Sequence, residues 1–183
     1  MPPAGLNLHG LVRGAINRVN PDVQAVYLRS KGAVDNADGT RTPAYQAPFF
    51  VGAQLQPPSA RDLRHMEYLN LQGVLRTAFL YSNPQGIVRV SQTGGDLLMF
   101  PQSQPHVLYD SNGDIVYNSA GQPVLASTYW DLWLLTPAEW FDVNGLGFTK
   151  AYAQLQADGR QIVLNSKGLP VLSSSGTLVT STQ

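Results

Sequence analysis

Three carboxylates, Asp131, Glu139 and Asp142, lie among the tryptophans of residues 129–140. Two carboxylates that face each other across a site can divide the roles of general acid and general base. A hydrolase that uses Asp131 or Glu139 is therefore one hypothesis. The sequence provides no nucleophile elbow and no paired histidine beside them. We interpret them as surface carboxylates next to strands, which is the commoner placement, and we expect the chain not to be an enzyme.

A second acidic pattern, Asp110, Asn112 and Asp114, alternates like the start of a calcium-binding loop. Such a loop needs a glycine at its sixth position and a bidentate acid at its twelfth. Here Gly113 comes two positions early, and Gly121 stands where the acid belongs. The pattern therefore predicts a turn and no metal site.

Other chemical signatures are incomplete. The three histidines are isolated from one another, which supports neither a catalytic triad nor a zinc site. Residues 145–147 with Lys150 lack the rest of a phosphate-binding loop. Basic residues are dispersed, which argues against sequence-specific reading of nucleic acid. We expect no catalytic, cofactor-binding or metal-ligating residue, and no cofactor.

Composition places the chain among small proteins of the reducing compartment. A chain of 183 residues suggests one domain. It has no cysteine, so disulfides are excluded and folding in a reducing compartment, a cytoplasm, is natural. There is no signal pattern at the N-terminus, and no apolar run approaches the roughly 20 residues that span a bilayer. We expect a soluble protein with no membrane partner.

The net charge of zero divides unevenly along the chain. Residues 1–90 contain nine Lys or Arg and five Asp or Glu, a net charge of +4, whereas residues 91–183 contain three and seven, a net charge of −4. Such a division can orient one subunit against the next.

The elements that would position these residues are mostly strands. Helical spacing of apolar residues predicts a helix over residues 6–19, which Asn20-Pro21 ends. Ser59 and Asp62 resemble a capping box and predict a short second helix. Strands are predicted at residues 23–29, 45–56, 73–81, 87–90 and 96–100, with a polar turn region at 30–42 that carries the hairpin signal Asp38-Gly39.

Residues 94–156 form the predicted nucleus of the fold. Short apolar runs bounded by Gly, Pro or Asp indicate strands joined by turns, and all three tryptophans lie here. We interpret Trp130, Trp133 and Trp140 as core. The predicted fold class is mainly β: a small antiparallel β-barrel with an N-terminal helix, one short internal helix and protruding β-hairpin extensions.

Two segments repeat each other. Residues 115–127 and 162–174 are identical at nine of thirteen positions, and each surrounds an Asn-Ser-x-Gly turn in which Gly supplies positive φ. An isolated hairpin is marginal in water, so the apolar residues of these segments need partners. The candidate intersubunit contacts are Ile115, Val116, Val124, Leu125, Ile162, Val163, Val171 and Leu172.

These segments define the predicted organisation. Residues 1–101 and 128–156 form the barrel core with its N-terminal helix. Residues 102–127 are an inserted hairpin arm, and residues 157–183 are a C-terminal hairpin arm.

Several runs of ordinary residues resemble the neck or collar proteins of tailed bacteriophages, also called head completion or head–tail joining proteins. They are Leu8-His9-Gly10-Leu11-Val12-Arg13-Gly14-Ala15-Ile16, Ser59-Ala60-Arg61-Asp62-Leu63, Leu69-Asn70-Leu71-Gln72-Gly73, Gly94-Gly95-Asp96-Leu97-Leu98, and Trp133 with residues 150–156. The resemblance covers residues 6–156. It implies a small β-barrel that assembles into a ring of six or twelve subunits around the DNA channel. The inserted arm and the C-terminal arm depart from the family pattern.

The expected function is therefore structural: a virion protein of the neck, assembled in the host bacterial cytoplasm, that links the portal-side adaptor to the tail. Its expected partners are sibling subunits, neighbouring neck, adaptor and tail proteins, and double-stranded DNA that passes without sequence-specific binding. A tail-terminator or baseplate ring component is the alternative within this class. A carbohydrate-binding β-module is the alternative from another class, and exposed, coplanar tryptophans would favour it.

Overall fold

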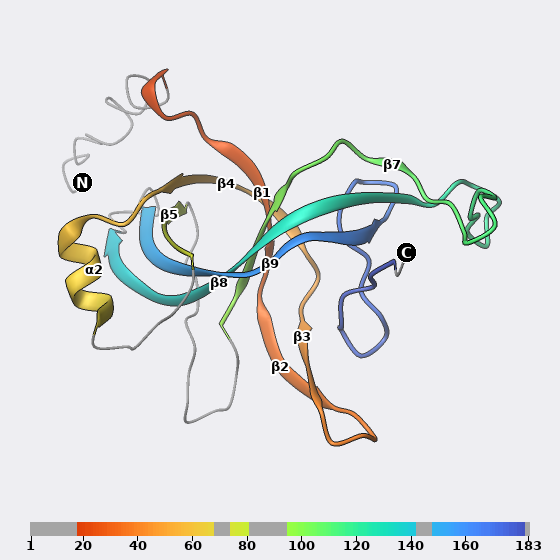
Figure 1. The fold of residues 1–183 in the computed structure, drawn as a ribbon, viewed down its shortest axis with the longest axis horizontal. Helices are drawn as coiled ribbons and strands as arrows, with labels where there is room; N and C mark the ends of the chain where they lie inside the picture. The colour runs from red at the N-terminus through yellow and green to blue at the C-terminus, as the bar shows by residue number, and fades with distance from the viewer. Residues whose placement is uncertain (1–17, 68–73, 81–94, 142–147, 182–183) are drawn as a thin grey trace, which may run out of the picture.

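The computed structural model describes residues 18–67, 74–80, 95–141 and 148–181 (Figure 1). At residues 65–67, 133–141, 148–149 and 156–158 it describes the backbone alone. The described chain is mainly β, which confirms the predicted class. The helix predicted over residues 6–19 lies outside the described residues except for its last two, so it stays a prediction. The strand predicted at 87–90 also lies outside them.

The described elements follow one another along the chain as nine strands and one helix. They are β1 (Val23–Leu28), β2 (Ser30–Asp35), β3 (Arg41–Tyr45), β4 (Phe49–Gln56), α2 (Ala60–Glu67), β5 (Leu75–Leu80), β6 (Leu97–Pro101), β7 (His106–Val107), β8 (Leu125–Phe141) and β9 (Phe148–Leu164). The predicted turn region at 30–42 is too broad, because β2 and β3 pair across most of it as a hairpin.

Antiparallel pairing closes the main sheet on itself. The seven described strands run in the order β6-β1-β4-β5-β9-β8-β7, and β6 also pairs with β8, which leaves β7 outside the closed ring. The strands are not spaced evenly around an axis, so the structure supports a closed ring of strands and not a regular barrel. Strands β2 and β3 form a separate sheet of two strands.

Small side chains fill much of the ring interior. The interior cluster contains Ala25, Ala53, Ala78, Ala151 and Ala153, together with Tyr27, Val51, Leu80, Leu98, Phe100 and Leu132. An eight-stranded barrel is just wide enough for its side chains to fill. A narrower ring leaves less room, and alanine allows its walls to approach.

A second core lies on the outer face of the ring. Strand β1 turns Ala25 and Tyr27 inward and Val26 and Leu28 outward, as the two-residue period of a strand requires. The outward side chains pack with Tyr45 and with apolar residues of the C-terminal segment, which comprises the end of β9 and the residues after it. These apolar residues are Ile162, Leu164, Leu169, Leu172 and Leu178. The ring wall is therefore buried on both faces here. The C-terminal segment supplies part of the cover.

Buried polar contacts tie distant segments together. The hydroxyl of Tyr27 donates a hydrogen bond to Oδ2 of Asp96. The backbone N–H of Ser30 donates to Oδ1 of the same carboxylate at 2.8 Å. Asp96 is fully buried, and these bonds fix the start of β6 against the end of β1.

The capping box predicted for the short helix is confirmed. The Asp62 N–H donates to the Ser59 hydroxyl at 3.2 Å, and the Ser59 N–H donates back to the Asp62 carboxylate at 2.9 Å. This reciprocal pair satisfies two backbone donors that the first helical turn leaves without an intrahelical partner. Helix α2 therefore begins immediately after Ser59.

Strands β8 and β9 each extend over 17 residues, from the ring into an arm (Figure 1). Their pairing has four register shifts, the first between Tyr129 and Trp130. Such irregularities bend a strand and increase its twist. Strand β9 runs without a break across residues 156 and 157, which are the predicted boundary between the barrel core and the C-terminal arm.

Candidate interaction surfaces

The repeated segments follow a period of eight residues. Four octapeptides, at residues 109–116, 117–124, 164–171 and 172–179, share the form Tyr/Leu, Asp/Asn/Ser, Ser, any residue, Gly, any residue, Ile/Pro/Leu, Val. We name residues 107–125 the distal unit and residues 162–180 the proximal unit. Each unit contains two of the octapeptides and three short extended segments.

All four octapeptides form the same turn. In the second, the Asn118 N–H donates to the Gln122 carbonyl at 2.9 Å, and the Gly121 N–H donates to the Asn118 carbonyl at 3.0 Å. The glycines have φ between 72° and 88°, the left-handed region that a residue without Cβ adopts without strain. The predicted Asn-Ser-x-Gly turns, with Gly at positive φ, are confirmed.

Each unit closes its three extended segments with a ring of three backbone hydrogen bonds. In the distal unit Val116 donates to Leu108 at 3.0 Å, Val124 donates to Val116 at 2.8 Å, and Leu108 donates to Val124 at 2.9 Å. In the proximal unit the same ring joins Val163, Val171 and Val179, with distances of 2.9 to 3.1 Å. The two units are therefore structural copies with an approximate internal three-fold arrangement.

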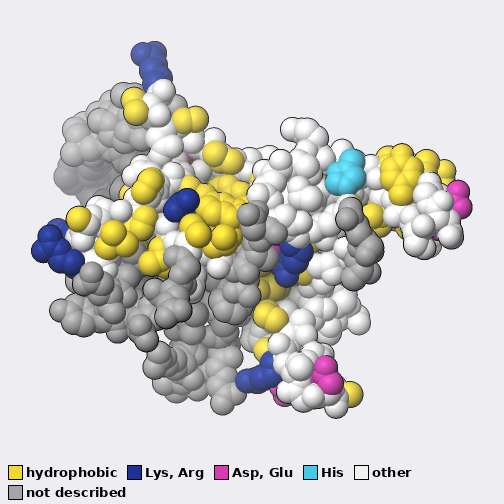
Figure 2. Space-filling model, viewed as in Figure 1, with side chains coloured by type: hydrophobic (Ala, Val, Ile, Leu, Met, Phe, Trp, Pro, Cys, Tyr) yellow, Lys and Arg dark blue, Asp and Glu magenta, His cyan; other side chains and the backbone are white. Residues whose placement is uncertain are grey.

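The two copies differ in their surroundings. In the proximal unit Ile162 and Leu164 are buried in the outer core, and Leu172 and Leu178 pack against it. In the distal unit Tyr109 is 58% exposed, Tyr117 57% and Ile115 38%. Figure 2 shows hydrophobic and acidic side chains gathered at the far end of this arm. The distal unit thus presents apolar area of the kind that the proximal unit buries.

The candidate contacts named from the sequence divide accordingly. Ile115 is exposed, and Val116, Val124 and Leu125 are half-buried in the distal unit. Ile162 is fully buried within its own chain, whereas Val163, Val171 and Leu172 are half-buried. Ile162 therefore contributes to the core of the chain. Tyr109 and Tyr117 were not among the contacts predicted from the sequence. They stand at the first position of their octapeptides, where the other two copies have leucine, and that shared position could have indicated them.

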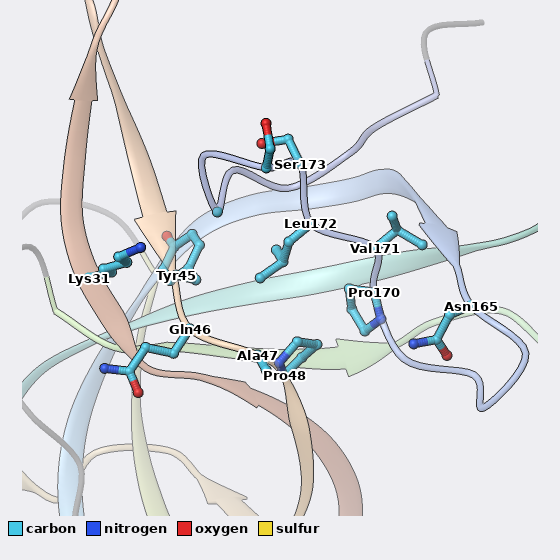
Figure 3. A pocket seen from close by; sticks show the side chains of 12 residues that line it. Lys31, Tyr45, Gln46, Ala47, Pro48, Asn165, Pro170, Val171, Leu172 and Ser173 are labelled. Atoms are coloured by element: carbon cyan, nitrogen blue, oxygen red, sulfur yellow. The ribbon is translucent and has the colours of Figure 1, made fainter.

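A groove of about 670 Å³ runs between the proximal unit and the segment around β3 (Figure 3). Tyr45 and Pro48 line one side, and Pro170 and Leu172 line the other, with Lys31 at one end. At the end of the groove the Tyr45 N–H donates to the Gly176 carbonyl at 2.8 Å. This bond attaches the proximal unit to β3.

Polar contacts fix the base of the arm to the ring. The Ser127 hydroxyl donates to the Ser103 carbonyl at 2.7 Å, and the Thr128 N–H donates to the Ser103 hydroxyl at 3.0 Å. Further out, β7 pairs with β8 through His106 and Val107. The arm therefore leaves the ring as a paired, hydrogen-bonded extension.

The carboxylates considered for catalysis do not form a described acid pair. Asp131 is fully buried and forms an ion pair with Arg160 on the neighbouring strand β9. The interpretation of Asp131 as a surface carboxylate is wrong. For Glu139 the structure describes the backbone alone, and Asp142 lies outside the described residues.

The environment of Asp131 alters its ionisation. Burial raises its pKa to about 6, because it disfavours the charged form more strongly than Arg160 favours it. The guanidinium of Arg160 is one-third exposed, so water weakens its attraction to the carboxylate. The raised pKa reflects the burial of the carboxylate, and among the described residues no second acid is among its causes.

A second buried carboxylate, Asp62, behaves in the opposite way. Burial alone would raise its pKa, but hydrogen bonds from Lys150, Ser59 and Tyr152 outweigh that effect and hold the pKa well below its usual range. The Lys150 amine donates to Oδ1 at 2.7 Å and the Tyr152 hydroxyl at 2.9 Å. Asp62 therefore joins α2 to β9, a role that local sequence does not indicate.

The remaining candidates have structural roles. Asp110 accepts hydrogen bonds from the N–H groups of Asn112 and Asp114 at 2.8 and 2.9 Å and so caps its own turn. Trp130 is half-buried against the interior cluster, with the Arg76 guanidinium 5.5 Å from its ring centroid. For Trp133 and Trp140 only the backbone is described. Within the described part of the chain, no group of three or more His, Asp or Glu could hold a metal ion.

No protein-family model, curated protein or solved structure matches this chain. In the ranges that the structure describes, no helix has the length and apolar character needed to cross a membrane.

Proposed function

We propose that the chain is a structural virion protein, a subunit of the head–tail connector ring in the neck of a tailed phage. In this proposal the closed ring of strands is the small β-barrel of the subunit, and six or twelve copies surround the DNA channel. The subunit links the portal-side adaptor to the tail and performs no catalysis. The resemblance of residues 6–156 to neck proteins supports this class.

The observation that carries the proposal is the distal unit. Its extended segments satisfy one another's central backbone groups, yet Tyr109 and Tyr117 are more than half exposed at the end of a paired arm. Tyrosine is enriched where proteins contact one another, because it combines large apolar area with a polar tip. An arm built in this way is suited to contact another protein of an assembly.

Trp130 bears on the carbohydrate-binding alternative. A sugar platform requires an exposed aromatic face, whereas Trp130 is half-buried, and Arg76 lies over its ring. Trp130 is the one tryptophan whose side chain the structure describes, and it does not offer the open face that this alternative requires, so we do not propose it.

Removing the gene from the phage that encodes the chain tests the proposal. Loss of a neck subunit should leave DNA-filled heads and complete tails that fail to join, and supplying the protein in trans should restore joined particles. Electron microscopy of lysates distinguishes this from tails of irregular length, which a tail terminator would give, and from absent tails, which a baseplate component would give. Absence of the protein from intact particles, measured by mass spectrometry, would overturn the proposal.

A further inference from the structure

The distal unit carries an uncovered apolar surface that its structural copy covers. The extended segments of the distal unit are residues 107–109, 115–117 and 123–125. Tyr109 and Tyr117 are therefore the third residues of their segments, and Ile115 is the first. First and third positions of a strand point to the same side. In the proximal unit the counterparts of Tyr109 and Tyr117 are Leu164, which belongs to the outer core, and Leu172, which packs against it. The counterpart of Ile115 is Pro170, which is buried. A unit of this type therefore binds an apolar β surface through these positions.

The groove beside the proximal unit is a surface of the same kind. Tyr45 and Leu172 belong both to the outer core and to the lining of the groove. The groove thus continues, toward solvent, the contact that already holds the proximal unit. Pro48 and Pro170 extend its apolar lining. A second unit placed in the groove would enlarge an existing contact.

Charge favours the same pairing. Residues 102–128 contain two acidic residues, Asp110 and Asp114, and no Lys or Arg. The groove has Lys31 at one end, and Lys167 is exposed on the adjacent turn, next to the lining residue Asn165. Exposed pairs of opposite charge contribute little affinity, but they orient the approach of one surface to another.

We propose that the distal unit of one copy docks into the groove of a second copy of this chain. The two contacting surfaces are different, so each copy can use its distal unit toward one neighbour and its groove toward another. Such a heterologous contact generates a closed ring when the rotation between copies closes. The inference rests on the proposed ring in one respect, since it takes the partner of the arm to be a sibling subunit.

The groove of the same chain is not the partner in this arrangement. Tyr109 and Tyr117 are exposed while the groove of their own chain is open. The base of the arm is held by the Ser103 hydrogen bonds and by the pairing of β8 with both β7 and β9. Docking onto a neighbour leaves these bonds in place.

Chemical cross-linking tests this contact directly, because the chain has no cysteine. Two full-length variants, Ser119→Cys and Ser174→Cys, are mixed and treated with a short bismaleimide at concentrations up to the solubility limit. Ser119 is exposed on the distal turn beside Tyr117, and Ser174 lines the groove and is exposed. We expect a cross-linked pair that joins position 119 to position 174, identified by mass spectrometry. The matched control mixes Ser119→Cys with Asp38→Cys on the exposed β2–β3 turn, and it should give no pair above background.

A charge reversal gives a second measurement that does not depend on the cysteines. Lys31→Glu and Asp114→Lys, each alone, should weaken self-association about two- to fivefold, as expected for exposed pairs. Combining them in one chain should restore it. Sedimentation measures the association, and circular dichroism confirms that each variant is folded.

The outcomes separate the contact from the proposed function. Lack of a 119–174 cross-link, together with no effect of either charge reversal, overturns the contact, and the protein's presence in the neck would still support the function. A specific 119–174 cross-link in a protein that is absent from phage particles supports the contact and overturns the function. Equal cross-linking to position 38 would show that the arm associates non-specifically, and this result would overturn the contact.

Discussion

The Lys150 amine on β9 donates a hydrogen bond at 2.7 Å to Oδ1 of Asp62, the residue that also closes the capping box of α2. One carboxylate thus joins a helix N-terminus to a strand 88 positions away. Asp62 is almost fully buried, and Lys150 is only one-fifth exposed. Water therefore screens this pair less than a surface pair.

Replacing Asp62 with Ala should reduce the free energy of unfolding by about 2 to 4 kcal/mol, because it removes the cap and leaves the Lys150 amine without this partner. Asp62→Asn keeps an oxygen acceptor and should cost less. Urea unfolding at pH 7 measures both, and Asp38→Ala on an exposed turn is the control. A loss from Asp62→Ala no larger than the control loss would show that the network does not stabilise the fold.

At Gly176 the proximal unit lies close against β3. A Cβ at this position would lie 2.7 Å from the Tyr45 carbonyl oxygen, and its φ is +88°. Gly113 has nearly the same φ, +87°, in the same turn type, but nothing lies within 4 Å. The two glycines therefore share the left-handed backbone conformation and differ in the space around them.

Gly113→Ala should cost about 1 to 2 kcal/mol of unfolding free energy from the left-handed backbone alone. Gly176→Ala should cost more, because the new methyl group must also push β3 away from the proximal unit. Urea unfolding gives the difference, and faster hydrogen exchange of the Tyr45 amide would locate it. Equal losses for the two variants would mean that a methyl group at position 176 does not press on β3.

Local chemistry made several of these features predictable. The capping box and the turns depend on residues three or four positions apart, so a single sequence contains their whole signal. The mainly β class and the similarity of the two repeats were predictable for the same reason. Closure of each unit by three hydrogen bonds was not, because Leu108, Val116 and Val124 pair only after two turns have formed.

Burial by distant segments explains the remaining differences. Tyr129 and Asp131 alternate with inward residues, a pattern that suggests a solvent-facing side, yet the C-terminal segment contributes to the cover over that side. The hydrogen bond of Tyr27 to Asp96 spans 69 positions. Neither contact can be predicted from the spacing of residues that are close in the sequence. The same limit applies to the groove, whose two sides come from segments more than a hundred residues apart.

Asp131 should make stability depend on pH between about 4 and 6. Its pKa in the folded protein, about 6, exceeds the value of about 4 of an unfolded chain. The folded state therefore holds the proton more tightly, and stability falls as pH rises through this window and then levels off. The shift corresponds to a loss on the order of 2 to 3 kcal/mol.

Asp131→Asn should remove this loss, because the neutral side chain cannot ionise. The stability of the variant relative to the parent should increase from pH 4 to pH 6, and Asp114→Asn on the exposed arm is the matched control. Urea unfolding at several pH values measures the difference. If the free energies of unfolding of Asp131→Asn and of the parent change in parallel with pH, Asp131 ionises in the folded chain as readily as in the unfolded one.

Asp131→Asn also tests the expectation of no catalysis. Three separate variants, Asp131→Asn, Glu139→Gln and Asp142→Asn, should each leave particle assembly and infectivity close to normal. Plaque counts and electron microscopy of the resulting particles report the two properties separately. Normal particles with lost infectivity in any of the three would reveal chemistry that depends on that carboxylate.

Removing the arm separates folding from assembly. Gln102 and Thr128 face each other at its base, where the Gln102 N–H donates to the Thr128 carbonyl at 2.8 Å. Deletion of residues 103–127 and closure with Asp-Gly would join these strands by a tight hairpin turn, for which Asp-Gly is well suited. The interior cluster contains no residue of the deleted segment. The outer core loses Leu125, a partly buried neighbour.

We therefore expect the shortened chain to keep its β-type circular dichroism spectrum and a cooperative thermal transition, at a somewhat lower melting temperature. Its self-association and its incorporation into particles should fall sharply, because the distal unit is gone. A milder variant, Tyr109→Ser with Tyr117→Ser, keeps the arm and removes most of its exposed aromatic area, so it should fold as the parent does and assemble poorly. An unfolded shortened chain beside a folded double-serine variant that assembles normally would show that the arm supports the fold and does not serve assembly.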